Sequence, residues 1–339
     1  MSANTSLPTV PFGKTGMDIT RVGFGSWAIG GGDWAVGWGD QDDDASIKAI
    51  RHAVSRGVNW IDTAAIYGLG RSEEVVAAAL EGIPPSERPY VFTKCGLIGD
   101  PANPNEMPKN IGNPDSLRAE LDASLRRLKV EQIDLYQMHW PTTDGTPIEV
   151  YWATLLDMKK SGKVRAVGLS NHNAAQLAAA EKLGHVDTLQ PPFSAIKREI
   201  AETELDWCRA HETGVIVYSP MQAGLLTGAF SKERVAGLPK NDWRSRSAEF
   251  TTNLDRNLAV AKALETVARR HDASTAAAAV AWTLAWPGVT AAIVGARSPK
   301  QVDGWLAAAT LELTAEDMAE VGEAITAGGA GIGPASPEA

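Results

Sequence analysis

Short β-rich runs alternate with amphipathic segments eight times between Arg21 and about Ala308, and this repetition limits what the chain can fold into. Such alternation is typical of βα units that share a parallel sheet. Eight units predict an α/β protein whose sheet closes into a (β/α)8 TIM barrel. The expected strands are Arg21–Gly25, Trp60–Asp62, Tyr90–Lys94, Asp134–Met138, Val164–Gly168, Thr188–Gln190, Val215–Ser219 and Ala292–Val294.

The segments between these strands carry helix signals. Several of them open with Asp, Ser, Asn or Pro, as the first turn of a helix requires. After the barrel, Thr314–Ile325 begins with a capping-box pattern and predicts an additional C-terminal helix. The clearest helical segments within the barrel are Ala45–Ser55, Pro114–Leu128, Val150–Lys160 and Leu258–Arg270.

The two ends of the chain depart from the βα pattern. Apolar residues flank a Gly/Lys turn in Val10–Ile19, which predicts a β-hairpin that plugs the bottom of the barrel. Residues 327–339 are rich in Gly, Ala and Pro, and we expect them to form a disordered tail. A single barrel domain accounts for residues 1–326, because such barrels commonly exceed about 200 residues.

Composition and charge narrow the class of protein. With 44% hydrophobic and 22% charged residues, the chain resembles globular proteins that bury a large core. A net charge of -9 disfavours nucleic acid and anionic membranes as main partners. We therefore expect a small-molecule partner, and the composition leaves a monomer and a homo-oligomer equally open.

The cysteines and the N-terminus bear on the compartment. Cys95 and Cys208 lie far apart, and neither belongs to a metal-ligand spacing, so we expect no disulfide framework and no metal. The first residues lack the basic and apolar regions of a signal peptide, and no apolar run reaches about 18 residues. Together these features predict a cytoplasmic protein.

Three long connections interrupt the rhythm of the units: Gly30–Asp44, Cys95–Asn113 and Thr227–Thr252. Each follows a strand, so each lies at the C-terminal rim, where barrel enzymes build their active sites. We expect these loops to shape a substrate pocket.

A glycine motif on the first of these strands points to a different fold. Gly23–Ala28 matches the dinucleotide-binding pattern G-x-G-x-x-G/A. That fingerprint needs a helix to begin at the glycines, and no helical period follows in Gly30–Trp34. We therefore disfavour a Rossmann fold.

The segment Gly57–Glu73 resembles the signature of the aldo-keto reductases, in which a strand-end Asp is followed five residues later by a Tyr. The resemblance implies a (β/α)8 barrel that transfers hydride between a nicotinamide cofactor and a carbonyl or an alcohol. It extends over nearly the whole chain through Phe92–Lys94, Asp134–His139, Gly168–Asn171, Gln190, Tyr218–Gly228 and Gly295–Gln301.

Four residues match the catalytic set of this family: Asp62, Tyr67, Lys94 and His139. Asp62, Lys94 and His139 follow different expected strands, whose ends barrel closure brings together. Tyr67 is expected to exchange a proton with the reacting oxygen, with its pKa lowered by the Lys94 ammonium. Asp62 would keep Lys94 charged, and His139 would orient the carbonyl.

Each of the four also has a purely structural interpretation. Asp62 and Lys94 can form an ion pair at the rim, and Tyr67 can be a core aromatic with its hydroxyl at the surface. A lone His after a strand, such as His139, is commonly an ordinary polar residue. The matching positions of all four favour catalysis.

The resemblance also implies a cofactor trough. Ser170, Asn171 and Gln190 would hold the nicotinamide carboxamide, Tyr218 would stack on the ring, and the backbone from Ser219 to Leu225 would wrap the pyrophosphate. The residues assigned to the cofactor are Trp27, Ser170, Asn171, Gln190, Tyr218, Ser219, Pro220, Met221, Gly224, Leu225, Gly295, Arg297, Gln301 and Trp305.

Arg297 indicates the cofactor preference. A guanidinium can hold a 2′-phosphate with two hydrogen bonds, so we expect NADP(H) to be preferred, with NAD(H) as the alternative. A solvated surface arginine is the competing interpretation. Gly304 and Trp305 stand where the family usually has an acidic residue and an Asn, so the adenine contacts are expected to differ.

Apolar and aromatic residues on the rim loops predict a largely apolar substrate pocket. We assign Trp27, Ile66, Trp140 and Trp243 to substrate binding. Aromatic aldehydes, larger ketones and ring alcohols would fit. An alcohol or sugar dehydrogenase that works mainly in the oxidative direction would use the same four catalytic residues, and a cofactor-sensing regulatory subunit of the same fold is a less favoured alternative.

Overall fold

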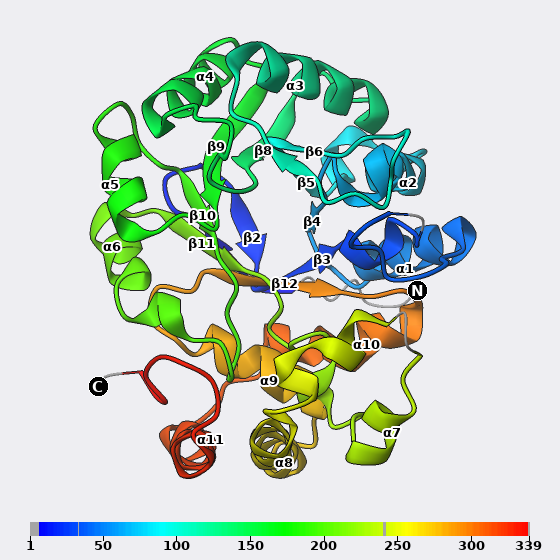
Figure 1. Ribbon diagram of the computed structural model, residues 1–339, viewed down its shortest axis with the longest axis vertical. Coiled ribbons are helices and arrows are strands. Elements are labelled where there is room, and N and C mark those ends of the chain that lie inside the picture. Colours follow the sequence, from blue (N-terminus) through cyan, green and yellow to red (C-terminus); the bar gives the residue numbers. More distant parts are fainter. Residues whose placement is uncertain (1–6, 33, 240–241, 338–339) are drawn as a thin grey trace.

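The centre of the molecule is a closed barrel of eight parallel strands surrounded by helices (Figure 1). The computed structural model describes residues 7–32, 34–239 and 242–337. The strands follow one another around the barrel in chain order, and β12 pairs with β3 to close it, which confirms the predicted fold. The barrel strands are β3 (Val22–Gly25), β4 (Trp60–Asp62), β5 (Tyr90–Cys95), β8 (Ile133–Met138), β9 (Val164–Ser170), β10 (Thr188–Gln190), β11 (Gly214–Val217) and β12 (Ala291–Gly295).

The helices cover the outside of the barrel, and α8 and α11 lie side by side at the lower end of Figure 1. The predicted helix at residues 114–128 has the same bounds in the structure, because the Asn113 side chain caps its first amides and Pro114 opens it. The helices are α1 (Asp43–Ser55), α2 (Arg71–Leu80), α3 (Pro114–Leu128), α4 (Ile148–Lys160), α5 (Ala174–Glu181), α6 (Glu204–His211), α7 (Lys232–Ala236), α8 (Leu254–Arg270), α9 (Thr275–Leu284), α10 (Pro299–Leu306) and α11 (Ala315–Gly328).

The bottom of the barrel is closed by the predicted hairpin, in which β1 (Thr9–Pro11) pairs antiparallel with β2 (Asp18–Thr20). Its side chains Phe12 and Met17 are buried against the residues that fill the lower barrel. The ring of Phe12 stacks on Phe92 with 5.7 Å between centroids. The hairpin is therefore a plug.

The upper layer of the barrel interior is polar. Side chains of a strand point to the same side at every second residue. Phe92 and Leu135 lie in the lower core, so Lys94 and Gln137, two residues further along β5 and β8, enter the layer above it, where they are paired in register. The strands themselves therefore deliver charged and amide groups to the rim end of the barrel.

The long rim connections contain short elements that the sequence did not predict. The second one holds a small antiparallel pair, β6 (Leu97–Ile98) and β7 (Lys109–Asn110). The third holds α7, and its residues 240–241 lie outside the described part of the chain. These connections lie above the polar layer.

The C-terminal segment differs from the expected disorder over residues 327–337. The last helix continues to Gly328, and Ala330 after it is 1% exposed. Gly331 and Gly333 adopt positive φ angles of 66° and 97°, and a Cβ atom at either would meet backbone at 2.3 to 2.6 Å. Glycine is thus required for the close approach of this segment, and the glycine content that suggested disorder has a packing role.

Buried Arg198 fixes this segment to the barrel. Its Nε donates to the carbonyl of Pro334 at 2.8 Å, and its Nη2 donates to the carbonyls of Ala330 and Gly333 at 3.0 and 3.1 Å. A pattern of local composition does not reveal a partner more than 130 residues away. The predicted absence of a signal peptide in residues 1–6 and the predicted disorder of residues 338–339 concern parts of the chain outside the described residues.

We expect Arg198→Ala to lower the free energy of unfolding by about 3 kcal/mol, because it leaves several buried carbonyls without their charged donor. Urea unfolding measures this loss, and limited proteolysis should cut residues 329–337 faster. Arg209→Ala is the matched control. Within the described part of the chain, the Arg209 side chain bonds only to exposed Asp206, so its removal should change stability by less than about 0.5 kcal/mol. Unchanged cleavage in Arg198→Ala would show that the arginine does not hold the segment.

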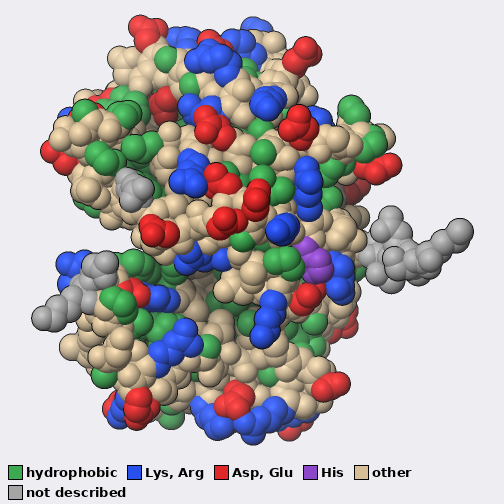
Figure 2. Space-filling view, turned by 90° about the vertical axis from the view of Figure 1, so that its right-hand side faces the viewer, with side chains coloured by type: hydrophobic (Ala, Val, Ile, Leu, Met, Phe, Trp, Pro, Cys, Tyr) green, Lys and Arg blue, Asp and Glu red, His purple; other side chains and the backbone are tan. Residues whose placement is uncertain are grey.

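The outer surface carries charges of both signs. On the face drawn in Figure 2, acidic and basic side chains are interspersed around a recess. Among the described residues, no helix has both the length and the apolar character needed to cross a bilayer.

Candidate active site

Lys94 and Asp62 form a buried ion pair at the rim end of the barrel. Lys94 Nζ lies 2.6 Å from Asp62 Oδ1, and the two side chains are 0% and 3% exposed. Nζ also donates to the carbonyl of Thr63 at 2.8 Å and to the hydroxyl of Tyr67 at 3.4 Å. The three protons of the ammonium thus have three acceptors.

The pair is held together against its own desolvation. Burial raises the pKa of Asp62, and the nearby Lys94 counteracts this. Burial lowers the pKa of Lys94, and the charge and hydrogen bond of Asp62 counteract this, with a smaller contribution from Glu73. Because each partner is the main support for the charge of the other, the loss of one leaves an uncompensated group in the core.

Tyr67 lies in the loop directly after β4, in a short 3₁₀ turn, with its hydroxyl above Lys94. Burial raises its pKa well above the ordinary value, and the charge of Asp62 raises it further. The expectation that Lys94 lowers this pKa therefore differs from the structure, because burial raises the pKa most and the charge of Asp62 opposes that of the ammonium. The hydroxyl stays protonated at neutral pH, as a proton donor must.

His139 follows β8 and faces the Tyr67 ring, with 5.8 Å between the ring centroids. Burial lowers its pKa well below the ordinary value, and Lys94 adds to this effect. The imidazole is therefore neutral and carries one ring proton. Its Nδ1 has no hydrogen-bond partner within the described parts of the chain.

Amide groups connect the ion pair to the neighbouring strands. Gln190 Nε2 donates to Asp62 Oδ2 at 2.8 Å and to Gln137 Oε1 at 3.4 Å. Sequence reasoning missed Gln137, although its position two residues before His139 places it on the inward side of the strand. Gln190 thus contacts the Asp62 carboxylate and also lines the pocket.

A second set of hydrogen bonds fixes the ends of β9 and β11. The Tyr218 hydroxyl donates to Asn171 Oδ1 at 2.7 Å, and Asn171 Nδ2 donates to the carbonyl of His139 at 2.9 Å. Ser170 Oγ donates to the carbonyl of Gln190 at 2.8 Å. Three of the residues assigned to the nicotinamide, Asn171, Gln190 and Tyr218, therefore lie together beside His139.

A pocket of ≈ 940 Å³ joins these groups to the rim loops. It does not include Lys94, which lies beneath Tyr67, nor Ser170 and Leu225, which are fully buried. Trp243 also lies outside it; its ring packs on Trp38, which does line the pocket. The assigned residues in the wall are Trp27, Asp62, Ile66, Tyr67, His139, Trp140, Asn171, Gln190, Tyr218, Ser219, Pro220, Met221, Gly224, Gly295, Arg297, Gln301 and Trp305.

The substrate end of the pocket has apolar walls from several loops. Trp27 and Ile66 line it as predicted, and Trp140, 40% exposed, lies at its edge. Met107 and Pro108 from the second rim loop line it too, although no periodic pattern in this loop predicts them. Apolar side chains thus line the part of the pocket that Tyr67 shares with Trp27 and Ile66.

The other end of the pocket carries positive charge. Three guanidinium groups, of Arg234, Arg244 and Arg297, line it. Asp242 holds Arg244 at 2.6 Å, and Arg244 lies 5.8 Å from the Trp38 ring centroid. Guanidinium groups suit the phosphates of a dinucleotide.

In the turn after β11, residues 219–225, some backbone amides donate hydrogen bonds to carbonyls of the same turn. The amides of Gln222 and Gly224 donate to the carbonyls of Ser219 and Met221. These two amides are therefore committed within the turn, so the expected contact of the turn with a pyrophosphate falls to its other backbone amides.

Gly304 and Trp305, the two positions expected to differ from the family pattern, both line the pocket. Trp305 is 1% exposed, and its indole N–H lacks a partner among the described residues. A Cβ atom at Gly304 would have no neighbour within 4 Å. The pocket is therefore open at Gly304 and backed by the indole.

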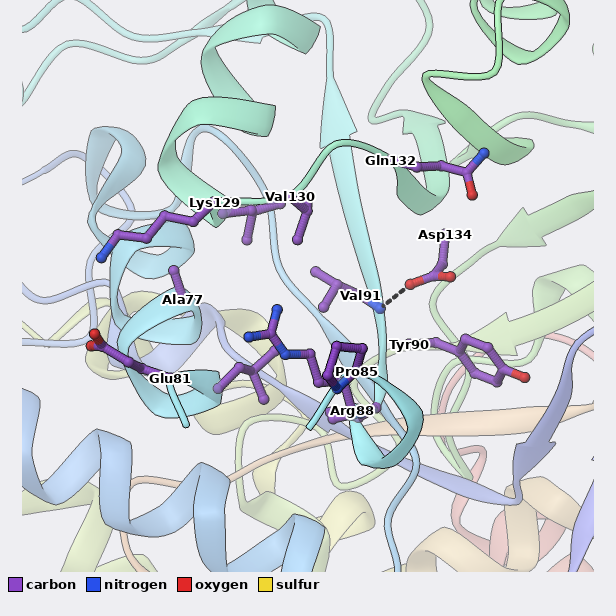
Figure 3. A pocket seen from close by; sticks show the side chains of 13 residues that line it. Ala77, Glu81, Pro85, Arg88, Tyr90, Val91, Lys129, Val130, Gln132 and Asp134 are labelled. Carbon is purple, nitrogen blue, oxygen red and sulfur yellow. Dashed lines mark hydrogen bonds between the residues drawn. The ribbon is translucent and has the colours of Figure 1, made fainter. Parts of the chain in front are cut away.

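A smaller pocket of ≈ 400 Å³ lies at the opposite end of the barrel, near the beginning of β5 (Figure 3). Arg88, Lys129 and Glu81 surround it, and Asp134 accepts a hydrogen bond from the Val91 amide at 2.9 Å. None of the predicted site residues lines it.

Comparison with known proteins identifies the family of this chain. The family model of the aldo/keto reductases matches residues 21–326. The chain belongs to this family. An NADH-specific methylglyoxal reductase of Escherichia coli (strain K12) is 33% identical over 333 residues, which are 94% of this chain and 99% of the relative. The aldo-keto reductase YhdN of Bacillus subtilis (strain 168) is 32% identical, with 91% and 90% of the two chains covered.

Solved structures of aldo-keto reductases superpose on this one. The glycerol dehydrogenase AKR11B4 from Gluconobacter oxydans has a TM-score of 0.86 and 34% identity over 100% of both chains. The holo form of aldo-keto reductase AKR11C1 from Bacillus halodurans has a TM-score of 0.75 and 22% identity over 98% of both chains, which shows the shared fold.

Proposed function

We propose that this aldo-keto reductase is an NADP(H)-dependent oxidoreductase that interconverts an aldehyde or a ketone and the corresponding alcohol, with Tyr67 as general acid and base. The observation that carries this proposal is the position of Lys94 Nζ, which contacts both the Asp62 carboxylate and the Tyr67 hydroxyl beneath the pocket. His139 and Trp140 line the same end of the pocket, so a carbonyl can reach the hydroxyl there.

The residues around the pocket suit a nicotinamide dinucleotide. Amides of Asn171 and Gln190 and the ring of Tyr218 lie beside His139, and the guanidinium groups lie at the other end. The unpartnered Nδ1 of His139 is a buried polar atom that the protein alone does not satisfy. The reduced cofactor supplies a hydride, and the protein supplies the proton and the orientation.

The protein groups have separate tasks in reduction. Tyr67 donates its hydroxyl proton to the carbonyl oxygen as negative charge develops there. The Lys94 ammonium stabilises the resulting phenolate across 3.4 Å, and Asp62 keeps that ammonium charged. Neutral His139 donates a hydrogen bond that orients the carbonyl. In the oxidative direction Tyr67 takes the proton back.

The preference for NADP(H) rests on the guanidinium of Arg297 in the adenosine end of the pocket. A 2′-phosphate would gain charge-assisted hydrogen bonds there. The name of the Escherichia coli relative states NADH specificity, so NAD(H) remains the alternative for this chain.

The substrate follows from the walls of the pocket. Trp27, Ile66, Met107 and Trp140 favour aromatic aldehydes and larger ketones. The names of two relatives point to methylglyoxal and glycerol, which are small and oxygenated, and the second of them favours an alcohol dehydrogenase as the alternative.

A panel of carbonyls and alcohols, assayed with both cofactors between about pH 6 and 9, tests the proposal. We expect carbonyl reduction to be nearly independent of pH, because the raised pKa of Tyr67 keeps its proton in place. Alcohol oxidation should accelerate as the pH rises, since it needs Tyr67 to accept a proton.

Benzaldehyde, methylglyoxal, glyceraldehyde and glycerol form the core of that panel, and turnover is followed by cofactor absorbance. Binding of cofactor without turnover of any carbonyl or alcohol would contradict an oxidoreductase. Faster turnover with NADH than with NADPH at equal concentrations would contradict the cofactor preference alone.

A further inference from the structure

Residues 34–42, which we call the strap, cross the mouth of the pocket between β3 and α1. At one end the Ala35 amide donates to the carbonyl of Pro104 in the second rim loop at 2.9 Å. In the middle the indole of Trp27 donates to the carbonyl of Val36 at 3.1 Å. The strap thus joins the substrate side of the rim to the adenosine side.

The adenosine end of the strap is bonded to Arg297. Arg297 Nη1 donates to the carbonyl of Trp38 at 3.3 Å, Nη2 donates to the carbonyl of Asp40, and Nε donates to Gln41 Oε1. Gln41 Nε2 in turn lies 3.4 Å from the carbonyl of Arg297. Every guanidinium nitrogen of Arg297 therefore has an acceptor in the strap.

These bonds occupy one N–H on each guanidinium nitrogen, which is three of the five donors that a 2′-phosphate could use. A dianionic phosphate forms stronger hydrogen bonds with a guanidinium than neutral oxygens do, so it can displace the strap oxygens. The free energy of the displaced hydrogen bonds then reduces the net gain from binding the phosphate. A cofactor without the 2′-phosphate leaves them intact. The strap therefore opposes the advantage that Arg297 gives to NADP(H).

We propose that Gln41 is a specificity-determining residue that limits the preference for NADP(H) over NAD(H) by competing for Arg297. This inference rests on the proposed role of Arg297. Gln41 is the one side chain of the strap that contacts this guanidinium among the described residues; the other two acceptors are backbone carbonyls. A substitution at Gln41 therefore changes the competition without altering the guanidinium.

A purely structural role for Gln41 makes a different prediction. Its Nε2 also donates to Ser46 Oγ in α1 at 3.0 Å. The helix itself is capped by Asp42, whose Oδ1 accepts from the Ala45 amide at 2.7 Å, so α1 keeps its start without Gln41. A structural role would change the affinities for NADPH and NADH by the same factor.

The test uses Gln41→Ala and Gln41→Glu in the full chain, with the affinities for NADPH and NADH measured by protein fluorescence and those for 2′,5′-ADP and ADP by calorimetry. We expect Gln41→Ala to raise the ratio of NADPH to NADH affinity by about 5-fold, because the phosphate displaces one bond fewer. Gln41→Glu should lower this ratio by about 10-fold, since its carboxylate pairs with Arg297 and repels the phosphate. The ratio for 2′,5′-ADP and ADP should follow.

Arg297→Ala and Gln132→Ala complete the set. Gln132 is an exposed glutamine at the opposite end of the barrel, and its removal should leave both affinities unchanged. Suppose that Arg297→Ala lowers the ratio of NADPH to NADH affinity. If both Gln41 variants then leave this ratio unchanged, or both shift it in the same direction, the inference about Gln41 is wrong and the proposed cofactor preference stands. If Arg297→Ala leaves the ratio unchanged, Arg297 does not bind the 2′-phosphate, and both are wrong.

Discussion

Tyr67→Phe should lower the turnover of carbonyl reduction by about 10³-fold or more, because it removes the only proton donor proposed for the carbonyl oxygen. The ring remains, so its packing against Trp27, with 6.3 Å between centroids, and its place in the pocket wall are kept. The dissociation constants for the cofactor should therefore change by less than about 2-fold, since a single neutral hydrogen bond is at most involved.

Steady-state turnover and a fluorescence titration with cofactor separate these two effects. Tyr90→Phe is the matched control, because Tyr90 lies at the other end of β5, where its ring faces Arg165. That variant should retain full activity. If Tyr67→Phe kept a tenth or more of the parental rate, Tyr67 would not be the general acid.

Lys94→Met should both inactivate and destabilise the protein. It leaves the Asp62 carboxylate in a site that is 3% exposed, without the partner at 2.6 Å that supports its charge. Breaking a buried pair on one side typically lowers the free energy of unfolding by about 3–5 kcal/mol. The deficit should shrink as the pH falls, because the buried carboxyl can then take up a proton, and a raised folded-state pKa favours the native state at low pH.

Denaturant unfolding at about pH 5 and 8 measures this loss. The double variant Asp62→Asn with Lys94→Met carries no buried charge at this position, so it should regain a large part of the lost stability while remaining inactive. If the free energy of unfolding lost by the double variant instead equals the sum of the losses in Asp62→Asn and Lys94→Met, the two residues act independently.

Much of the fold could be predicted from sequence because its signals are local. The strands at residues 60–62 and 188–190 have the predicted bounds, and the other six differ by one or two residues at their ends. The helix at residues 114–128 was exact because Asn113 and Pro114 mark its first turn. Continuous burial along the strands and capping in helices leave traces in neighbouring residues.

The features that sequence did not predict depend on distant pairs. Gln41 and Arg297 are 256 positions apart, and no sequence pattern around either residue predicts a contact with the other. The contacts of Arg198 with the C-terminal segment and the position of Trp243 outside the pocket depend likewise on how loops pack after the barrel closes. The four proposed catalytic residues were assigned from a resemblance, and the raised pKa of Tyr67 needed the burial that only the fold provides.

The hairpin plug has a consequence for the timing of the reaction. With Phe12 and Met17 filling the bottom of the barrel, the rim pocket is the shared entrance for both reactants. The proposed nicotinamide site at Asn171 and Gln190 lies at strand ends, whereas Met107 and Trp140 lie further out on the loops. If the cofactor occupies the deeper site, we expect it to bind before the substrate and to dissociate after the product.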